Sequence, residues 1–586
     1  MRCNKGKILN KIINQENNCD ECKILQKVTD IILEDVYLFY TSNLLDIFKS
    51  LVPIEIDGQL IIVNPTYIND LSADEILREK TNYIGINGEV YHDKKEIANK
   101  CNLIMGLILD DVKNLIEDNP KQYIIALLSM LEYCNHLVSS LVIWLNSNMD
   151  EIENPNDDVA FMIKQLNNVK KYSKEQFPYI YKTWEGELSS EKYGIQNMIE
   201  ILNYFSSDKE LIIEKINSLK LQKLLQYTRA LQQLLYIKDE AINGGELEIN
   251  GLGDLLASNK YDYDEFTKYY VDSMAKQNRD NLNDEAKKRF NKICKRYIGL
   301  QLEEIFCILK NFSKYFYNND EFIICDVQNF SRIIEDILPE VPKENITKFI
   351  NYLVYDVNTF KFPQDANLND NRVLRKCLMP ILNNVFASPA GIIKHSLLGL
   401  YMDIINANIP KGDFQKELFK VKSDYIDKKF EVQVGQFLKE NLNGVYVKWG
   451  IEKDEVPDIN NKGKFIDLYG EIDVILIIKG KMIVIECKNP ILKLTPKEIN
   501  NETNRFEKES PKFFQTKLQK KINKIYLNWD SVIEYLNVPN TIKIEKDLPM
   551  GVIVTSTFNL SLMNENLKFP VLLLNDLIEW LDKNII

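Results

Sequence analysis

Two acidic residues in the last third of the chain are spaced so that they would face each other across a β-hairpin. Residues 471–488 are EIDVILIIKGKMIVIECK, in which two apolar, β-branched runs flank Lys479–Gly480. A two-residue Xaa-Gly link between such runs predicts a hairpin, and a turn at these residues places Asp473 opposite Glu486. Opposed carboxylates repel each other and destabilise the strand pair unless a cation lies between them. The spacing therefore predicts a metal site.

Alternation along the two strands predicts which side chains share a face with these acids. Glu471 lies opposite Lys488 in the same register, so four polar side chains are expected together at one end of the hairpin. The apolar side chains expected on the other face are Ile472, Val474, Leu476, Ile483 and Ile485.

The acids and the lysine of this stretch resemble the motif of the PD-(D/E)XK nuclease superfamily, which has the restriction-endonuclease-like fold. The motif is an acid on one strand and acid-x-Lys on the next, here Asp473 and Glu486-Cys487-Lys488. The resemblance implies that both carboxylates and the backbone carbonyl of Cys487 bind Mg²⁺, for which Mn²⁺ can substitute. It also implies that Lys488 positions or activates the attacking water.

The sequence departs from the motif in two places. The usual proline is missing, since Ile472 precedes Asp473. Glu471 is a third acid beside the site, and it either adds a metal ligand or pairs with Lys488.

The segments around the hairpin follow the order helix, strand, hairpin, helix, strand, which is the core order of the superfamily. Tyr425–Leu442 has apolar residues at helical spacing, and Glu431 lies along its buried side, where a carboxylate without a partner is unusual. Members of the superfamily place a glutamate on this helix, so the resemblance adds Glu431 to the acids that hold the metal. Gly444–Trp449 and Gly551–Thr555 supply the two further strands.

A basic helix is expected between the hairpin and the last of these strands. It would begin at Ser510–Pro511, with serine as N-cap and proline in the first turn, and end near Trp529. Gln515 points to its buried side, and the resemblance implies a catalytic glutamine there, for which Gln519 fits almost as well. Contact with phosphates is the functional interpretation of its lysines, and a solvated helix face is the alternative. These lysines are Lys517, Lys520, Lys521 and Lys524.

Charge is distributed unevenly along the chain, whose formal net charge is −12. Residues 411–586 hold 27 basic and 26 acidic residues, whereas residues 1–410 hold 46 and 59. Nearly all of the excess acidity lies outside the nuclease-like region, which therefore remains suited to nucleic acid.

With 586 residues the chain is too long for a single core, and we expect a multidomain α+β protein. A mostly helical domain with small hairpins is predicted at 1–240, and a helical or mixed domain at 241–410. Residues 411–586 are predicted to form the nuclease-like α/β domain with a mixed central sheet. The breaks at these boundaries are Asn243-Gly244-Gly245 and Ile409-Pro410-Lys411-Gly412.

Several elements are predicted within the first two domains. Xaa-Gly turns between apolar residues predict hairpins at Ile54–Val63 and Tyr83–Tyr91. A short strand is expected at Phe322–Cys325, and His395 is expected to be a packed side chain rather than a catalytic base. Helices predicted from apolar periodicity are Ile24–Leu51, Lys100–Ile116, Gln122–Asn146, Tyr193–Phe205 and Leu219–Ile237.

The composition is that of an ordinary soluble protein, with 45% hydrophobic and 27% charged residues. No apolar run approaches about 18 residues and the N-terminus lacks a signal-peptide core, so we expect a cytoplasmic protein without membrane contact. Scattered cysteines favour reduced, buried thiols. Cys19 and Cys22 have metal-knuckle spacing, with Cys3 as a third ligand, but the fourth ligand of a zinc site is not evident.

Together with the resemblance, these features predict an Mg²⁺-dependent nuclease that hydrolyses phosphodiester bonds, with double-stranded DNA as the favoured substrate. A long helical region attached to such a nuclease resembles the sensor and effector arrangement of bacterial anti-phage defence proteins. That analogy implies a homo-oligomer and a phage-derived or defence-system protein partner. Two alternatives stay open: a nuclease of repair, recombination or RNA processing, and a non-catalytic scaffold that binds nucleic acid.

Overall fold

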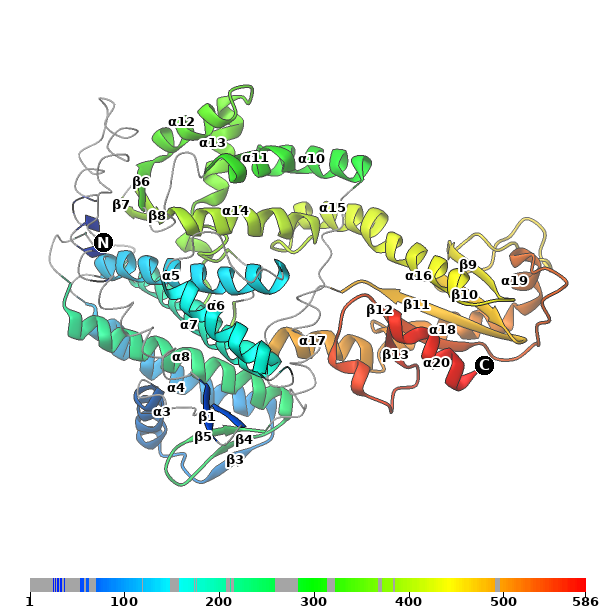
Figure 1. Ribbon diagram of the computed structural model, residues 1–586, viewed down its shortest axis with the longest axis horizontal. Coiled ribbons are helices and arrows are strands. Elements are labelled where there is room, and N and C mark those ends of the chain that lie inside the picture. The colour runs from blue at the N-terminus through cyan, green and yellow to red at the C-terminus, as the bar shows by residue number, and fades with distance from the viewer. Residues whose placement is uncertain are drawn as a thin grey trace. The chain divides into compact units, whose positions relative to one another are not determined.

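Helices dominate the first part of the chain, and a mixed sheet organises the last part (Figure 1). The protein is multidomain and divides into two compact units at Leu418–Phe419. This division lies within helix α15 (Asp413–Lys422), close to the boundary expected at residue 410. The boundary expected at residue 240 lies inside helix α8 (Ser218–Gly244).

The computed structural model describes most of the chain. Longer described segments are 53–56, 59–62, 70–117, 120–147, 157–172, 177–206, 216–258, 283–312, 322–366, 371–382, 385–490 and 496–585. Single described residues are 25, 27, 29, 30, 32, 33, 36, 174 and 211. The residues of the candidate zinc site lie outside this part of the chain: Cys3, Cys19 and Cys22.

The first helices of unit 1 bury the apolar residues that recur at helical spacing in the sequence. Asp93 caps α4 (Lys94–Leu115) by accepting hydrogen bonds from the amides of Lys95 and Glu96. The helices predicted between Lys100 and Ile237 are all present, most with wider bounds, whereas most of Ile24–Leu51 lies outside the described residues. The other helices of this part are α3 (Asp70–Ile84), α5 (Pro120–Ser147), α6 (Asp157–Tyr172), α7 (Phe177–Phe205) and α8.

The interior of unit 1 holds an unusually apolar helix. By length and composition the segment Pro120–Leu145 of α5 could cross a membrane, but an apolar 18-residue stretch of it is 78% buried within the protein, as in a core helix. Its Cys134 is a buried thiol that is not part of a disulfide, in agreement with the prediction of reduced cysteines. The other described cysteines that are not part of a disulfide are Cys101, Cys294, Cys307, Cys325, Cys377 and Cys487.

A three-stranded antiparallel sheet lies in the second half of unit 1. Strand β8 (Val385–Pro389) pairs with β6 (Phe322–Asp326) on one side and with β7 (Met379–Leu382) on the other. The strand predicted at Phe322–Cys325 is therefore confirmed. Burial, with Lys192 and Arg375 nearby, lowers the pKa of His395 to about 3, which keeps this side chain neutral. The surrounding helices are α10 (Asp284–Ile298), α11 (Leu302–Phe312), α12 (Val327–Ile337), α13 (Lys343–Leu353), the short η1 (Val357–Thr359) and α14 (Ala390–Ile405).

One of the two predicted hairpins is present and the other is wrong. Strands β1 (Pro53–Ile56) and β2 (Gln59–Ile62) pair with a two-residue link, as expected. Tyr83, however, belongs to α3, and β3 (Glu89–Tyr91) pairs with β4 (Leu247–Ile249), which pairs with β5 (Leu255–Ala257). The partner of β3 comes from a segment distant in sequence, which a local turn signal does not reveal.

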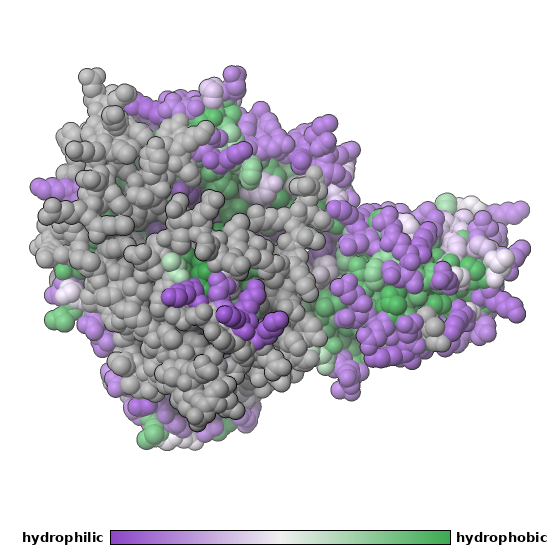
Figure 2. Space-filling view, in the orientation of Figure 1, coloured by the Kyte–Doolittle hydropathy of each residue, from purple (hydrophilic) through white to green (hydrophobic). Residues whose placement is uncertain are grey.

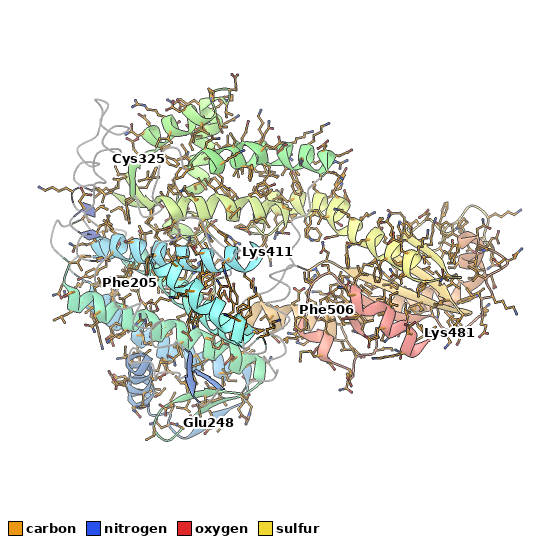
Figure 3. The ribbon with its side chains drawn as sticks, viewed as in Figure 1. Phe205, Glu248, Cys325, Lys411, Lys481 and Phe506 are labelled. Carbon is orange, nitrogen blue, oxygen red and sulfur yellow. The ribbon has the colours of Figure 1, made fainter. Side chains whose placement is uncertain are left out.

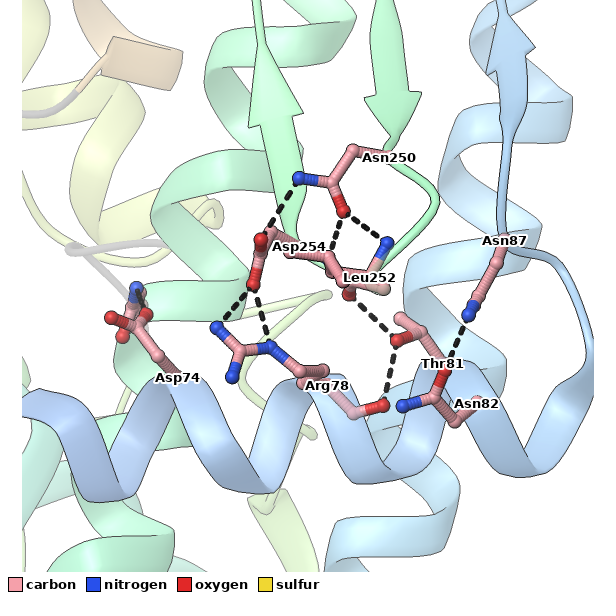
Figure 4. Close-up of polar contacts among 10 residues, drawn as sticks. Asp74, Arg78, Thr81, Asn82, Asn87, Asn250, Leu252 and Asp254 are labelled. Carbon is pink, nitrogen blue, oxygen red and sulfur yellow. Dashed lines mark hydrogen bonds and ion pairs between the residues drawn. The ribbon is translucent and has the colours of Figure 1, made fainter.

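The loop between β4 and β5 is held against α3 by side chains (Figure 4). Arg78 Nε lies 2.8 Å from Asp254 Oδ1, and Thr81 Oγ1 donates to the carbonyl of Gly253 at 2.7 Å. Asn250 Oδ1 accepts hydrogen bonds from two amides of the loop. Gly253 has a φ of +93°, and a Cβ there would lie 2.6 Å from Thr81 Oγ1, so glycine permits this close approach.

Five strands form a mixed sheet in unit 2, in the order β13-β12-β11-β10-β9. Strands β9, β10 and β11 are antiparallel neighbours, whereas β11, β12 and β13 run parallel. The predicted order of helix, strand, hairpin, helix and strand is present. Bounds of the strands are β9 (Tyr446–Ile451), β10 (Ile472–Ile478), β11 (Lys481–Lys488), β12 (Met550–Thr555) and β13 (Val571–Leu573).

Helices cover both faces of this sheet (Figure 1). On one face, α16 (Lys428–Asn441) and α20 (Leu577–Asn584) pack against the face of Val474, Leu476, Ile483 and Ile485. On the other face, α17 (Pro496–Glu507), α18 (Phe514–Leu527) and α19 (Trp529–Leu536) pack against Ile475, Ile477, Met482 and Val484. The predicted alternation of the hairpin is thus confirmed for these strand residues.

The predicted start of the basic helix is wrong. Ser510 does not cap α18, because its carbonyl accepts from the amide of Phe513 at 2.9 Å in a turn and the helix begins only at Phe514. Helix α16 begins at Lys428, after one turn of π-helix, η2 (Ser423–Asp427).

Candidate active site

The hairpin of β10 and β11 has the predicted register. Pairing runs from the turn at Lys479–Gly480 to Val474 opposite Ile485. Both turn residues have positive φ, +47° and +82°, as in the type I′ turns that suit two-residue hairpins. Lys481, labelled in Figure 3, marks the turn end, and the acids lie toward the opposite end.

The ladder opens just beyond its last pair, where Asp473 and Glu486 lie. The amide of Cys487 donates to Asp473 Oδ2 at 2.7 Å. A continued antiparallel ladder would bond this amide to the backbone of Ile472, and the side-chain carboxylate takes it instead. Ile472, two residues before Val474, packs with the apolar residues near α18 and not with those around Val474, contrary to the prediction.

Lys488 contacts both acids. Its Nζ lies 2.7 Å from Glu486 Oε1 and 3.5 Å from Asp473 Oδ2. The same ammonium group donates to the carbonyl of Cys487 at 2.8 Å. The structure therefore brings together the two acids, the lysine and the carbonyl that the motif names, and Asp473 and Glu486 are only 6% and 4% exposed.

Lys521 is a further member of this cluster. The sequence patterns did not predict that it lies beside the two acids. Its Nζ lies 2.5 Å from Glu486 Oε2 and 3.8 Å from Asp473 Oδ1, and the residue is 6% exposed. Lys521 is thus buried and not exposed as expected, and its contact with phosphates stays a prediction. The signal was present in the spacing, because Lys521 follows buried Leu518 by three residues and precedes buried Ile522.

Burial and charge pull the pKa values of the two acids apart. Burial raises the pKa of Asp473, and the charge of Glu486 raises it further. Burial would also raise the pKa of Glu486, but Lys488 and Lys521 outweigh this effect and lower that pKa to about 2. The pKa of Lys488 lies above its ordinary value, because both carboxylates outweigh the opposing effect of burial. Glu486 is therefore ionised at neutral pH between two ammonium groups.

Glu431 lies on α16 and is half-buried close to the two strands. Burial raises its pKa to about 8, with further contributions from the charges of Asp473 and Glu471. The structure thus brings Glu431 within electrostatic range of Asp473, as the prediction for this helix required.

Glu471 has a partner other than the expected Lys488. Its Oε1 lies 3.2 Å from Nζ of Lys428, whose ammonium also lies 3.0 Å from Glu452 Oε1. Glu471 therefore pairs with the first residue of α16, not with Lys488, and this contact ties the start of β10 to the helix that carries Glu431.

Gln515 bonds to the protein backbone and not to the residues of the candidate site. Its Nε2 donates to the carbonyl of Phe569 at 2.9 Å, and its Oε1 accepts from the amide of Phe569 at 3.0 Å. Both ends of the side chain are used by the backbone just before β13, so the structure does not bring Gln515 to the acids. Gln519, the alternative, donates to Asn523 on the same helix at 2.7 Å.

The remaining lysines of α18 lie at the surface. Lys524 is exposed and Lys517 is partly exposed. Lys520 donates to the hydroxyl of Tyr469 at 2.8 Å and lies 4.5 Å from the centre of its ring. Tyr469 has a φ of +66°, so a strained loop residue ahead of β10 stands beside the basic helix.

The donors at this end of the hairpin suit a hard divalent cation. In the part of the chain that the structure describes, no three His, Cys, Asp or Glu side chains are grouped to hold a metal ion. Asp473, Glu486 and the carbonyl of Cys487 are nevertheless gathered around ammonium groups, at a point where positive charge is already required. Mg²⁺ needs only one or two protein carboxylates when waters and substrate phosphates complete its shell. The donor set therefore fits Mg²⁺ or Mn²⁺.

Comparison of the chain with protein-family models, with curated proteins and with solved structures found no match. The chemistry of the site itself is therefore the basis for assigning a function.

Proposed function

We propose that unit 2 is a metal-dependent nuclease that hydrolyses phosphodiester bonds. The observation that supports it is the meeting of Asp473, Glu486 and Lys488 at one end of the hairpin, with the carbonyl of Cys487 beside them. Burial of the two acids together with the lysines that contact them costs desolvation free energy that apolar residues in their place would avoid. Such clusters of perturbed acids are typical of catalytic sites.

Asp473, Glu486 and the Cys487 carbonyl would hold the metal ion. The bound ion would neutralise charge on the phosphate and lower the pKa of its water. Lys488, already a donor to Cys487, is positioned to donate a hydrogen bond to the attacking water or to a phosphate oxygen. Glu431, whose pKa is about 8 in the metal-free protein, holds a proton next to these groups and would join the carboxylate ligands after losing it.

Double-stranded DNA is the proposed substrate, bound through the surface lysines of α18. Lys517, Lys520 and Lys524 follow one another at spacings of three and four residues on a helix that contains no acidic residue. Figure 2 shows hydrophilic residues over much of the visible surface of unit 2, with apolar residues between them. A phosphate backbone needs such a basic strip and not a large apolar patch.

Unit 1 is proposed to regulate the nuclease within a cytoplasmic anti-phage defence system, as part of a homo-oligomer that responds to a protein partner. Residues 1–410 hold 59 acidic against 46 basic residues, and this charge disfavours direct contact with phosphates. Phage plating on cells that express the wild type or Asp473→Asn tests this role. Equal plating on both strains, with active nuclease in vitro, removes the defence role and leaves the activity.

The nuclease itself is tested by incubating the full chain with plasmid, linear duplex, branched DNA and RNA. Each substrate is paired with Mg²⁺, with Mn²⁺ and with chelator, and Asp473→Asn serves as the matched control. The expected result is that the wild type with metal cleaves plasmid. The wild type with chelator and the Asp473→Asn variant should not cleave it. Cleavage of RNA or branched DNA alone would favour the processing or repair alternatives, and binding without cleavage would favour the scaffold.

A further inference from the structure

The four carboxylate oxygens of Asp473 and Glu486 are shared between two lysines. Lys488 Nζ lies nearest Glu486 Oε1 and Asp473 Oδ2, at 2.7 and 3.5 Å. Lys521 Nζ lies nearest Glu486 Oε2 and Asp473 Oδ1, at 2.5 and 3.8 Å. Each ammonium group therefore bridges the two acids through a different pair of oxygens.

The two lysines are attached differently. Lys488 belongs to the strand that carries Glu486, and its bond to the carbonyl of Cys487 fixes it within the hairpin. Lys521 comes from α18, and the partners of its ammonium group among the described residues are the two acids. A Cβ added at Gly470 would lie 3.8 Å from Lys521 Cε, in ordinary van der Waals contact, so the loop before β10 lies beside this side chain.

A divalent ion and the Lys521 ammonium group cannot use the same oxygens. Mg²⁺ binds its oxygen ligands at about 2.0–2.1 Å, and an ammonium group hydrogen-bonded to the same carboxylates would lie against the ion with like charge. A lysine has a flexible four-carbon stem and can move its charge without a change in the backbone. Lys521 is therefore the mobile cation of the cluster, and Lys488 the fixed one.

We propose that Lys521 is a built-in counter-ion, which holds the cation position between Asp473 and Glu486 until a divalent ion displaces it. The released ammonium group then binds a phosphate oxygen of the substrate, and this second step rests on the proposed nuclease function. Lys521 is thus a positioning residue in the metal-free protein and a substrate-binding residue after metal entry. The metal site is open to substrate only in its loaded form.

Mn²⁺ binding to the metal-depleted full chain tests the displacement, with calorimetry on the wild type, Lys521→Met and Lys524→Met. Lys521→Met should bind Mn²⁺ about tenfold more tightly, because the fraction of molecules with a free site rises. Lys524→Met, which removes an exposed lysine of the same helix, should bind as the wild type does. The Mn²⁺-induced rise in melting temperature should be larger for Lys521→Met than for the other two proteins.

Chemical labelling of the wild-type protein gives a second measurement that does not depend on the folding of a variant. Reductive methylation followed by peptide mass spectrometry should modify Lys521 slowly without metal and at least fivefold faster with Mn²⁺. Lys524 should react at the same rate in both conditions.

The outcomes separate this inference from the nuclease proposal. Unchanged Mn²⁺ affinity in Lys521→Met, with Lys521 still protected in the loaded wild type, overturns the displacement and leaves the metal site standing. Displacement without cleavage of any nucleic acid supports the counter-ion and removes the nuclease. If neither the wild type nor Lys521→Met binds Mn²⁺, both the counter-ion inference and the nuclease proposal are overturned.

Discussion

The amide of Cys487 donates to the carboxylate of Asp473 at 2.7 Å, so strand β11 holds the acid of β10 through a side chain and not through the ladder. The bond orients one oxygen of Asp473 and leaves the other toward Lys521. An amide side chain at position 473 could still accept this hydrogen bond, whereas alanine could not. Asp473→Asn and Asp473→Ala therefore distinguish the hydrogen bond that Asp473 accepts from the charge that it carries.

Asp473→Asn, Glu486→Gln and Lys488→Met should each lower nucleic-acid cleavage by about 10²-fold or more. Their losses should not add in double variants, because the three groups act as one unit. Asp473→Ala should lose as much activity and also melt at a lower temperature, since the amide of Cys487 loses its acceptor. Plasmid cleavage and circular dichroism provide the measurements, and wild-type cleavage by folded Lys488→Met would remove the assignment.

Glu431→Gln should stabilise the metal-free protein at alkaline pH. The pKa of Glu431 is raised from 4.5 to about 8 in the folded protein, chiefly by burial. Between these values the folded chain binds a proton that the unfolded chain has lost, so the free energy of unfolding falls as pH rises through this window. With allowance for solvent screening, the variant should gain about 1–2 kcal/mol above pH 8 and almost nothing near pH 4.

Denaturant unfolding with chelator at both pH values measures this difference. Glu440→Gln, at an exposed position of the same helix, is the matched control and should change stability little at either pH. A gain for Glu431→Gln that is equal at low and high pH would show that packing, not the proton, is responsible.

Removal of the surface lysines of α18 should weaken DNA binding with little dependence on sequence. For Lys517→Ala, Lys520→Ala and Lys524→Ala, the slope of log affinity against log salt should flatten by about one unit for each phosphate that the protein no longer neutralises. Lys481→Ala, at the turn end of the hairpin, serves as the control. Equal slopes for the wild type and the triple variant would identify this face of α18 as merely solvated.

Gln515→Ala should destabilise unit 2 by about 1–3 kcal/mol, because it leaves the buried amide and carbonyl of Phe569 without partners. Mn²⁺ affinity of the folded variant should stay that of the wild type. Gln519→Ala is the control and should cost less than about 0.5 kcal/mol, since Gln519 bonds only along its own helix. A large fall in Mn²⁺ affinity with unchanged stability would show that Gln515 belongs to the metal site.

Local patterns predicted the hairpin well. The two-residue turn at Lys479–Gly480 and the apolar alternation fix the register, and the register brings Asp473 next to Glu486. Alternation did not predict the packing of Ile472, which joins the apolar residues near α18, and no sequence pattern marks that point.

Contacts between distant segments account for most of what sequence did not reveal. Gln515 bonds to Phe569 across 54 residues, and β3 finds its partner in β4 instead of in a local hairpin. Lys521 was assigned by its charge to the surface, although its spacing from Leu518 and Ile522 places it on the buried face. A lysine can be buried at this position because acids from another element pair with its ammonium group, here Asp473 and Glu486.

The place of β11 at the middle of the sheet has a consequence for local opening. This strand is bonded to β10 on one side and to β12 on the other, where Glu486 is in register with Ile553. Its ladder amides are bonded to strands inside the sheet on both sides, so their exchange with solvent requires opening of the sheet interior, and such events approach unfolding of the whole unit in free energy. Strand β13, with three residues at the edge, can fray by itself. Glu486 is therefore carried by a slowly exchanging backbone, and loosening of the sheet edge leaves the position of its backbone unchanged.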